Sequence, residues 1–181
     1  MKAIETKLKG CFIIEPRVFN DERGYFYESF NSRVFNEITG VNTLFVQDNE
    51  SYSTKGVLRG LHFQVGDHAQ AKLVRVVKGK VLDVAVDIRK SSNTYGQYVA
   101  LELSEGNKKQ LFVPRGLAHG FVVLSEMAIF SYKCDNLYNK ESERGIIYND
   151  ETLNIDWKLP DNELIISEKD LLLPKFKNIE L

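Results

Sequence analysis

The sequence predicts an all-β fold, a barrel or sandwich with a few short helices, built as one domain over residues 1–181. Many short stretches are rich in β-branched and aromatic residues, and they recur about every 8–15 residues with turn signals between them. Few segments have helical periodicity, and no linker, low-complexity tract or long repeat divides the chain. With 43% hydrophobic residues, a chain of 181 residues can bury one sizeable core.

The N-terminal segment begins with a short apolar run, Phe12–Ile14, and continues into an aromatic strand over Gly24–Phe30. Asn31 is a suitable cap for a helix over Ser32–Thr39, and Gly40 is suited to ending it. We expect residues 1–40, approximately, to contact a second copy of the chain, because a bare aromatic edge strand invites pairing.

The central strands are expected over Leu44–Ser53, Ala71–Val77 and Val81–Ile88, with a tight turn at Lys78-Gly79. In the last of these, Leu82, Val84, Val86 and Ile88 share one face, whereas Asp83 and Asp87 share the other. Four further strands are predicted over Gln97–Leu103, Leu111–Pro114, Gly120–Leu124 and Met127–Cys134.

The tail from about residue 155 to 181 has turn signals and is expected to pack over the barrel. A net charge of −1 argues against nucleic acid or membrane as a partner. Cys11 and Cys134 match no zinc or redox spacing and are expected to be reduced and buried. The charged N-terminus is unlike a signal peptide, and no apolar run is long enough to span a membrane, so a cytoplasmic protein is expected.

Two stretches echo each other, Gly56–His62 and Pro114–His119, because each places a histidine behind Arg-Gly-Leu. They resemble the two half-motifs of a cupin, a small jelly-roll barrel with polar side chains in its mouth. A metal-binding cupin has His-x-His followed by Glu, but here Gln64 follows His62 and Lys72 takes the place of the Glu. A lysine ammonium has no lone pair for a metal, so we expect no metal and acid–base chemistry instead.

His62 is the best candidate for a general base, because an imidazole can take up a proton near neutral pH. Lys72 shares a strand face with Val74 and Val76 that should point inward, where its ammonium can stabilise negative charge on an oxygen. The competing interpretations are a structural histidine and a lysine that reaches out to water. His119 is a possible second base or donor.

Tyr132 is a candidate acid, since a phenol can return a proton to a carbanion and nearby cations lower its pKa. Either Asp170 or Asp83 could orient a histidine by accepting its second N–H. Tyr138 could stack on a flat ring. Arg23, Arg59 and Lys169 are candidate ligands for phosphate. Gln47 and Asn49 are candidates for contacts with the edge of a base.

These residues lie within a longer ordered set of motifs, by which the chain resembles the dTDP-4-dehydrorhamnose 3,5-epimerase family along nearly its whole length. The matching stretches are Phe19–Glu28, Phe45–Ser51, Leu58–Gln64, Lys72–Val74, Asp83–Arg89, Val113–Phe121, Tyr132–Lys133, Tyr138, Tyr148–Asp150, Ile155–Trp157 and Ser167–Asp170.

The resemblance implies that His62 accepts a proton, Tyr132 donates one, Asp170 pairs with His62 and Lys72 holds the C4 oxygen of a dTDP-sugar. It also implies that Tyr138 stacks on thymine. Further contacts with the nucleotide-sugar are implied for Arg23, Glu28, Gln47, Asn49, Arg59, His119, Glu143 and Lys169. The family is homodimeric and its N-terminal segments cross to the partner, so Arg23 and Glu28 are expected to serve the neighbouring site. No cofactor or metal is implied.

The expected reaction is inversion of C3 and C5 of dTDP-4-dehydro-6-deoxy-D-glucose, giving dTDP-4-dehydro-L-rhamnose. A 4-keto group acidifies the C–H bonds on both neighbouring carbons, so one base, one cation and one acid suffice. The same base would also serve an epimerase of C3 or C5 alone, or a ketoisomerase of a related sugar. Tyr132 favours inversion, because moving a carbonyl needs no acid on the opposite face. A non-catalytic sugar-binding cupin would not need His62, Tyr132 and Lys72 together.

Overall fold

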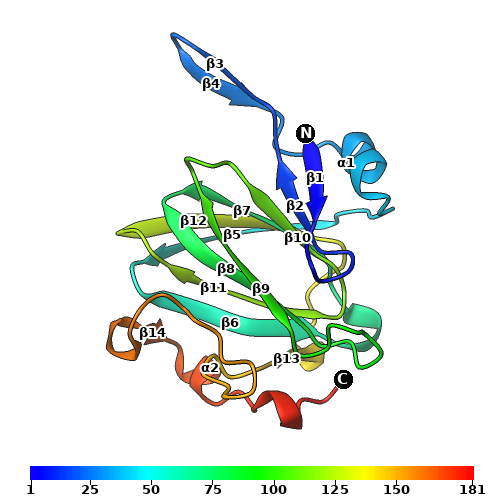
Figure 1. The fold of residues 1–181 in the computed structure, drawn as a ribbon, viewed down its shortest axis with the longest axis vertical. Helices are drawn as coiled ribbons and strands as arrows, with labels where there is room; N and C mark the ends of the chain where they lie inside the picture. Colours follow the sequence, from blue (N-terminus) through cyan, green and yellow to red (C-terminus); the bar gives the residue numbers. More distant parts are fainter.

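The computed structural model describes residues 1–181, and it contains the jelly-roll barrel that the sequence predicts, as two sheets packed face to face (Figure 1). The first sheet has the order β1 (Lys2–Glu5), β2 (Phe12–Glu15), β10 (Gln110–Val113), β7 (Lys72–Lys78), β12 (Met127–Cys134) and β5 (Gln47–Thr54). The second has the order β13 (Glu143–Gly145), β6 (Val57–Gln64), β11 (Leu117–Val123), β8 (Lys80–Asp87) and β9 (Tyr98–Ser104), with β14 (Ile165–Ile166) also paired to β6.

Side chains that alternate along the strands form one core between the sheets. Val74 and Val76 of β7 pack there against Val81 and Ala85 of β8 and against Phe121 of β11. Because successive side chains point to opposite faces of a strand, the inward positions of β8 include Asp83 as well. The space between the sheets therefore holds polar side chains as well as the apolar core.

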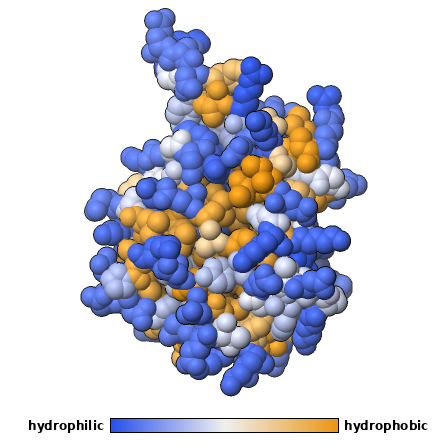
Figure 2. Space-filling view, viewed as in Figure 1, coloured by the Kyte–Doolittle hydropathy of each residue, from blue (hydrophilic) through white to orange (hydrophobic).

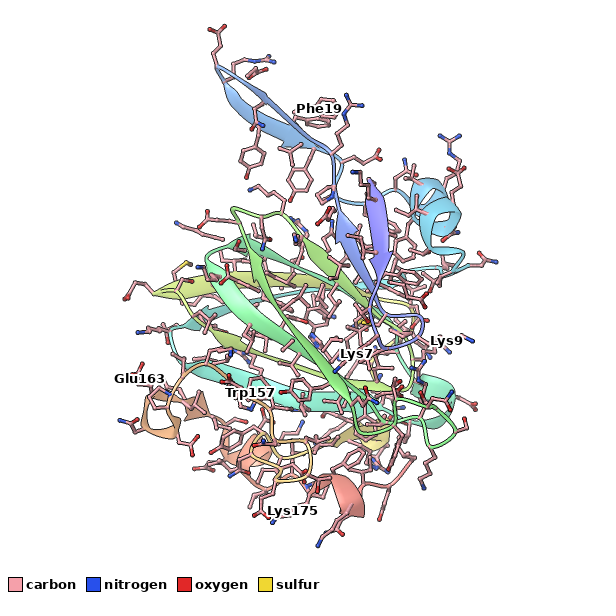
Figure 3. All side chains as sticks on the ribbon, viewed as in Figure 1. Lys7, Lys9, Phe19, Trp157, Glu163 and Lys175 are labelled. Carbon is pink, nitrogen blue, oxygen red and sulfur yellow. The ribbon has the colours of Figure 1, made fainter.

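The opposite face of β8 is also buried, because the C-terminal segment covers it. Leu82, Val84, Val86 and Ile88 pack in a second cluster that includes Trp157 and Phe176. In Figure 1 this segment, coloured orange to red, runs beneath β6 and β13, and Trp157 is labelled in Figure 3. The segment contains two 3-10 turns (Asp161–Glu163 and Phe176–Asn178) and the short helix α2 (Glu168–Leu171), and a further 3-10 turn, Lys140–Ser142, precedes β13.

The predicted helix is confirmed as α1, Ser32–Thr39. The Asn31 side chain accepts a hydrogen bond from the Val34 N–H, and Gly40 adopts a left-handed conformation with φ of 68°. Phe35 packs from this helix onto the outer face of the first sheet, with Phe112 and Leu73. No helix of the structure combines the length and the apolar character that crossing a membrane requires.

The aromatic strand predicted over Gly24–Phe30 is shorter in the structure, where it ends at Tyr27 and pairs with the strand before it. β3 (Val18–Asp21) and β4 (Gly24–Tyr27) form a separate two-stranded hairpin. It projects from the barrel, with Phe19 labelled on it in Figure 3. Phe26 is 71% exposed and Tyr25 57%. Figure 2 shows a hydrophilic tip with apolar residues at its base.

Two further strand boundaries differ from the prediction in a way that matters for the site. β5 spans Gln47–Thr54 rather than Leu44–Ser53, and β11 begins at Leu117 rather than Gly120. His119 therefore belongs to a strand, not to the loop before it. Pro114-Arg-Gly is a turn signal, and the predicted loop after it was too long. In the structure the turn occupies only residues 115 and 116, and the strand begins directly after it. Cys11 and Cys134 are both free and buried, as predicted.

Candidate functional site

Two adjoining cavities open between the sheets, and three polar side chains line both. The larger has a volume of about 530 Å³ and the smaller about 240 Å³. His62, Lys72 and Tyr132 line both cavities, so these three lie where the two spaces meet. The larger is lined in addition by Arg59, His119, Lys169 and Asp170, and the smaller by Gln47, Asn49, Tyr138 and Glu143.

The two echoed motifs lie on neighbouring antiparallel strands. His62 of β6 pairs in register with His119 of β11, which places both imidazoles on the interior side of the same sheet. The strands approach closely at Gly60 and Gly120. A Cβ on Gly60 would lie 2.7 Å from Gly120 Cα and 2.7 Å from the His119 carbonyl oxygen, and Gly60 has φ of 116°. This contact explains the glycine of the first motif and the glycine that directly follows His119.

Asp170 makes a direct hydrogen bond with His62. The His62 Nε2 lies 2.7 Å from Asp170 Oδ1, and the Gly60 N–H donates to Asp170 Oδ2 at 3.2 Å. The Ser167 hydroxyl caps α2 by accepting from the Asp170 N–H, which fixes the start of the short helix that carries the carboxylate. Burial alone would raise the pKa of Asp170, but the hydrogen bond from His62 and the Gly60 N–H bring the pKa below its ordinary value.

Asp83, the rival candidate for this role, orients the other histidine. Both carboxylate oxygens of Asp83 lie 3.0 Å from Nε2 of His119, and both side chains are buried. Of the two alternatives that the sequence left open for His62, the geometry therefore selects Asp170. Asp83 and His119 form a second carboxylate–imidazole pair beside the first.

Lys72 and Tyr132 reach the site from the opposite sheet. The Lys72 Nζ lies 5.9 Å from the centre of the Tyr132 ring. Burial lowers the pKa of Lys72, although Cys134, Glu143 and Asp83 oppose the shift. Burial raises the pKa of Tyr132 overall, and although the nearby Arg59 lowers it as expected of a cation, that contribution is the smaller one. Desolvation of the phenolate outweighs the attraction of the cation.

A network of hydrogen bonds surrounds the smaller cavity. Glu143 Oε2 accepts from the Tyr138 hydroxyl at 3.0 Å and also pairs with the Lys169 ammonium. Burial alone would raise the pKa of Glu143, but these two partners lower it overall. The Tyr138 N–H donates to Gln47 Oε1 at 3.0 Å, and the Gln47 amide donates to Asn49 Oδ1 at 3.1 Å.

Arg23 and Glu28 are the two predicted site residues that lie outside these cavities. Arg23 stands at the tip of the β3–β4 hairpin, where its side chain is 86% exposed and pairs with Asp21. Glu28 follows β4 and accepts a hydrogen bond from the Asn31 amide. The structure therefore does not bring this pair to the cavity of its own chain.

Gln64, at a would-be metal position, uses its side-chain amide to hold the backbone. Its Nε2 donates to the His68 carbonyl at 3.0 Å, and its Oε1 accepts from the Asn139 N–H at 2.7 Å. Nowhere in the structure do three or more His, Cys, Asp or Glu side chains gather as a metal ion would need.

Several lining residues were not identified from the sequence. Phe121 and Phe130 stack with ring centres 4.2 Å apart and form an apolar wall of the larger cavity. Ser51 lines the same cavity, and Ser53, behind the lining, accepts a hydrogen bond from Arg59 Nε at 3.1 Å. The serines share a period of two with Gln47 and Asn49 along β5, a signal that was present in the sequence.

Comparisons with known proteins agree with this geometry. A family model described as dTDP-4-dehydrorhamnose 3,5-epimerase matches residues 5–178. An epimerase of that name from Shigella flexneri is 54% identical over 176 residues, covering 97% of this chain and 96% of the relative. The crystal structure of another, from Elizabethkingia anophelis, superposes with a TM-score of 0.95 at 61% identity, over 98% of this chain and 97% of that one.

A third comparison includes a ligand. The crystal structure of a 3,5-epimerase from Legionella pneumophila in complex with dTDP-4-keto-L-rhamnose has a TM-score of 0.95 and 49% identity. The match covers 99% of this chain and 94% of that chain.

Proposed function

The chain belongs to the dTDP-4-dehydrorhamnose 3,5-epimerase family, and we propose that His62, Lys72 and Tyr132 carry out its reaction between the two sheets. The protein is an isomerase that acts on a nucleotide sugar. It inverts C3 and C5 of dTDP-4-dehydro-6-deoxy-D-glucose and yields dTDP-4-dehydro-L-rhamnose.

The observation that carries the assignment is that the base and the acid come from opposite sheets. His62 and its partner Asp170 stand on the side of β6, whereas Tyr132 and Lys72 belong to β12 and β7. Because all three line the junction of the two cavities, a sugar ring held there would have an imidazole on one face and a phenol on the other. Inversion of a carbon needs this arrangement.

In the first step His62 removes a proton from a carbon next to the keto group. The hydrogen bond to Asp170 keeps the proton on Nε2, and Nδ1 then has a lone pair free to accept the carbon-bound proton. Asp170 stays ionised because of its lowered pKa, so it also stabilises the imidazolium that forms. The C–H electron pair moves into the ring to form the C=C bond of an enolate.

In the second step Tyr132 returns a proton to the opposite face. The negative charge of the enolate resides on the C4 oxygen, where the Lys72 ammonium stabilises it. The phenol donates its proton to the carbon, the C4=O bond re-forms, and the configuration is inverted. Solvent then restores the proton of Tyr132 and removes the one on His62, so the same groups can serve the second carbon.

The smaller cavity is suited to the nucleotide. Tyr138 is 52% exposed at its mouth and presents a ring on which thymine can stack. Gln47 and Asn49 supply amide groups for the edge of the base, and Lys169, which lines the larger cavity, supplies a cation through its ion pair with Glu143. Arg59 and His119 then contact the remainder of the substrate from the larger cavity.

The activity is tested by following the sugar by NMR. Purified protein incubated with dTDP-4-dehydro-6-deoxy-D-glucose should give the L-rhamno product, with ring proton couplings that report inversion at both carbons. Inversion at C3 or C5 alone would instead identify a mono-epimerase, and a shifted carbonyl would identify a ketoisomerase. Unchanged substrate would exclude all three reactions.

The alkaline limit of activity should belong to Lys72. Its ammonium is needed in the protonated form, and burial places its pKa below the ordinary 10.5, so kcat/KM should fall as pH rises through that lowered value. Tyr132 must also be protonated, but burial shifts its pKa in the opposite direction, above the ordinary 10.0, which moves its own limit to higher pH.

Lys72→Arg tests this assignment, because a guanidinium stays protonated throughout the accessible range. The variant should be slower than wild type, yet its profile should remain flat to higher pH. An alkaline limb at the same pH in both proteins would show that another group causes it.

We propose that the protein is a homodimer whose β3–β4 hairpins reach the partner. The hairpin exposes Phe19, Tyr25 and Phe26, and it holds Arg23 away from the cavity of its own chain. Sedimentation at micromolar concentration should report a dimer, and Phe26→Asp should shift it toward monomer. A wild-type monomer would contradict the proposal.

We also propose a cytoplasmic location, since the two thiols are free, as in a reducing compartment.

A further inference from the structure

One side of β5 forms a row of four polar side chains, three of which line the cavities. Gln47, Asn49, Ser51 and Ser53 are each more buried than their exposed neighbours on the other side of the strand. Three of the four have hydrogen-bond partners. Gln47 and Asn49 bond to each other, Asn49 also donates to the Cys134 thiol at 3.7 Å, and Ser53 accepts from Arg59.

Ser51 is the exception. Its Oγ is buried, yet it has no hydrogen-bond partner within the protein. A buried hydroxyl without a partner costs free energy, and alanine at this position would avoid that cost. Ser51 pairs across the strands with Phe130, whose ring stacks on Phe121, and no group of the protein forms a hydrogen bond with its hydroxyl.

The position of Ser51 indicates which part of a ligand it meets. It lines the larger cavity with His62 and Tyr132, whereas Gln47 and Asn49 line only the smaller one. A nucleotide sugar is a linear chain of base, ribose, diphosphate and hexose. If the base lies beside Gln47 and Asn49, the hexose at the other end reaches the larger cavity.

We propose that the Ser51 hydroxyl binds a ring hydroxyl of the hexose and thereby orients the sugar between His62 and Tyr132. The inference rests on the proposed function and adds a sugar-specific contact to it. A serine hydroxyl can both donate and accept, which matches the secondary hydroxyls of a pyranose. In the structure the Oγ is turned away from the cavity that the residue lines, so rotation about the Ser51 Cα–Cβ bond would bring the hydroxyl to the bound sugar and give it a partner.

Calorimetry with two non-reacting ligands, dTDP and dTDP-quinovose, tests this contact. Ser51→Ala should weaken dTDP-quinovose by roughly five- to thirty-fold, the loss of one buried hydrogen bond. Its affinity for dTDP, which lacks the hexose, should change by less than about twofold. Thr54→Ala is the matched control, because Thr54 lies on the exposed side of the same strand, and it should bind both ligands as wild type does.

Thermal unfolding separates this role from a structural one. Without ligand, Ser51→Ala should unfold at the same temperature as wild type or higher, because the variant lacks an unpaired buried hydroxyl. A clear decrease would show that the hydroxyl stabilises the fold, which overturns the inference. Equal weakening of dTDP and dTDP-quinovose would place the contact on the diphosphate, and unchanged affinity for both would show that no contact exists. Failure of the wild type to bind either ligand would instead contradict the proposed function itself.

Discussion

His62→Asn should lose both solvent exchange and inversion, at C3 and at C5 alike. The asparagine amide can still bond to Asp170 and to substrate, but it has no lone pair basic enough to remove a carbon-bound proton. Since every later step needs the enolate, both carbons depend on this single group. The rate should fall by at least the ~10²–10⁴-fold that a general base usually contributes.

The third histidine provides the matched control. His68 lies in the 3-10 turn Gly66–His68, and its ring bonds to the Asn139 amide instead of lining a cavity. His68→Asn should therefore keep most of the activity. Binding of dTDP, measured by calorimetry, should be similar in all three proteins. A His62→Asn enzyme that still exchanges one of the two protons would show that His119, or another base, serves that carbon.

Tyr132→Phe should separate exchange from inversion. The variant keeps His62 and the Lys72 ammonium, so the enolate can still form. It lacks the acid on the opposite face, and His62 can return a solvent-derived proton only to the face from which it came. Deuterium from D₂O should therefore enter the sugar faster than the configuration inverts, whereas in the wild-type enzyme the two processes should be coupled.

Mass spectrometry of the sugar gives the exchange, and NMR of the same samples gives the inversion. Tyr52→Phe, at an exposed position outside both cavities, should behave as wild type in both measurements. If Tyr132→Phe loses exchange and inversion to the same extent, the phenol is needed to form the enolate. Its assignment as the returning acid would then be wrong.

The sequence predicted the barrel and its central groups because period-two patterns and short motifs carry that information. The two histidines behind the echoed Arg-Gly-Leu pair with each other across adjacent antiparallel strands. The inward face of β7 could be read from Val74 and Val76, and that face also carries Lys72. The capped helix Ser32–Thr39 was predicted to its end residues, since Asn31 and Gly40 are strong local signals.

Contacts between distant parts of the chain were harder to predict. The choice between Asp170 and Asp83 depended on where the tail crosses the barrel, and Asp170 lies 108 residues from His62. The sign of the Tyr132 pKa shift depended on burial, which no local motif reveals. A role for Ser51 could not be predicted, because only the structure shows that its hydroxyl is buried without a hydrogen-bond partner.

The most direct test of the two-faced mechanism is the position of deuterium in product made by the wild-type enzyme in D₂O. The account predicts one deuterium at C3 and one at C5 of dTDP-4-dehydro-L-rhamnose, because Tyr132 exchanges its proton with solvent before each delivery. Both labelled carbons should have the inverted configuration. Product that is inverted at both carbons but retains the original hydrogen at either one would contradict the account, since one group would then have moved the proton across the ring.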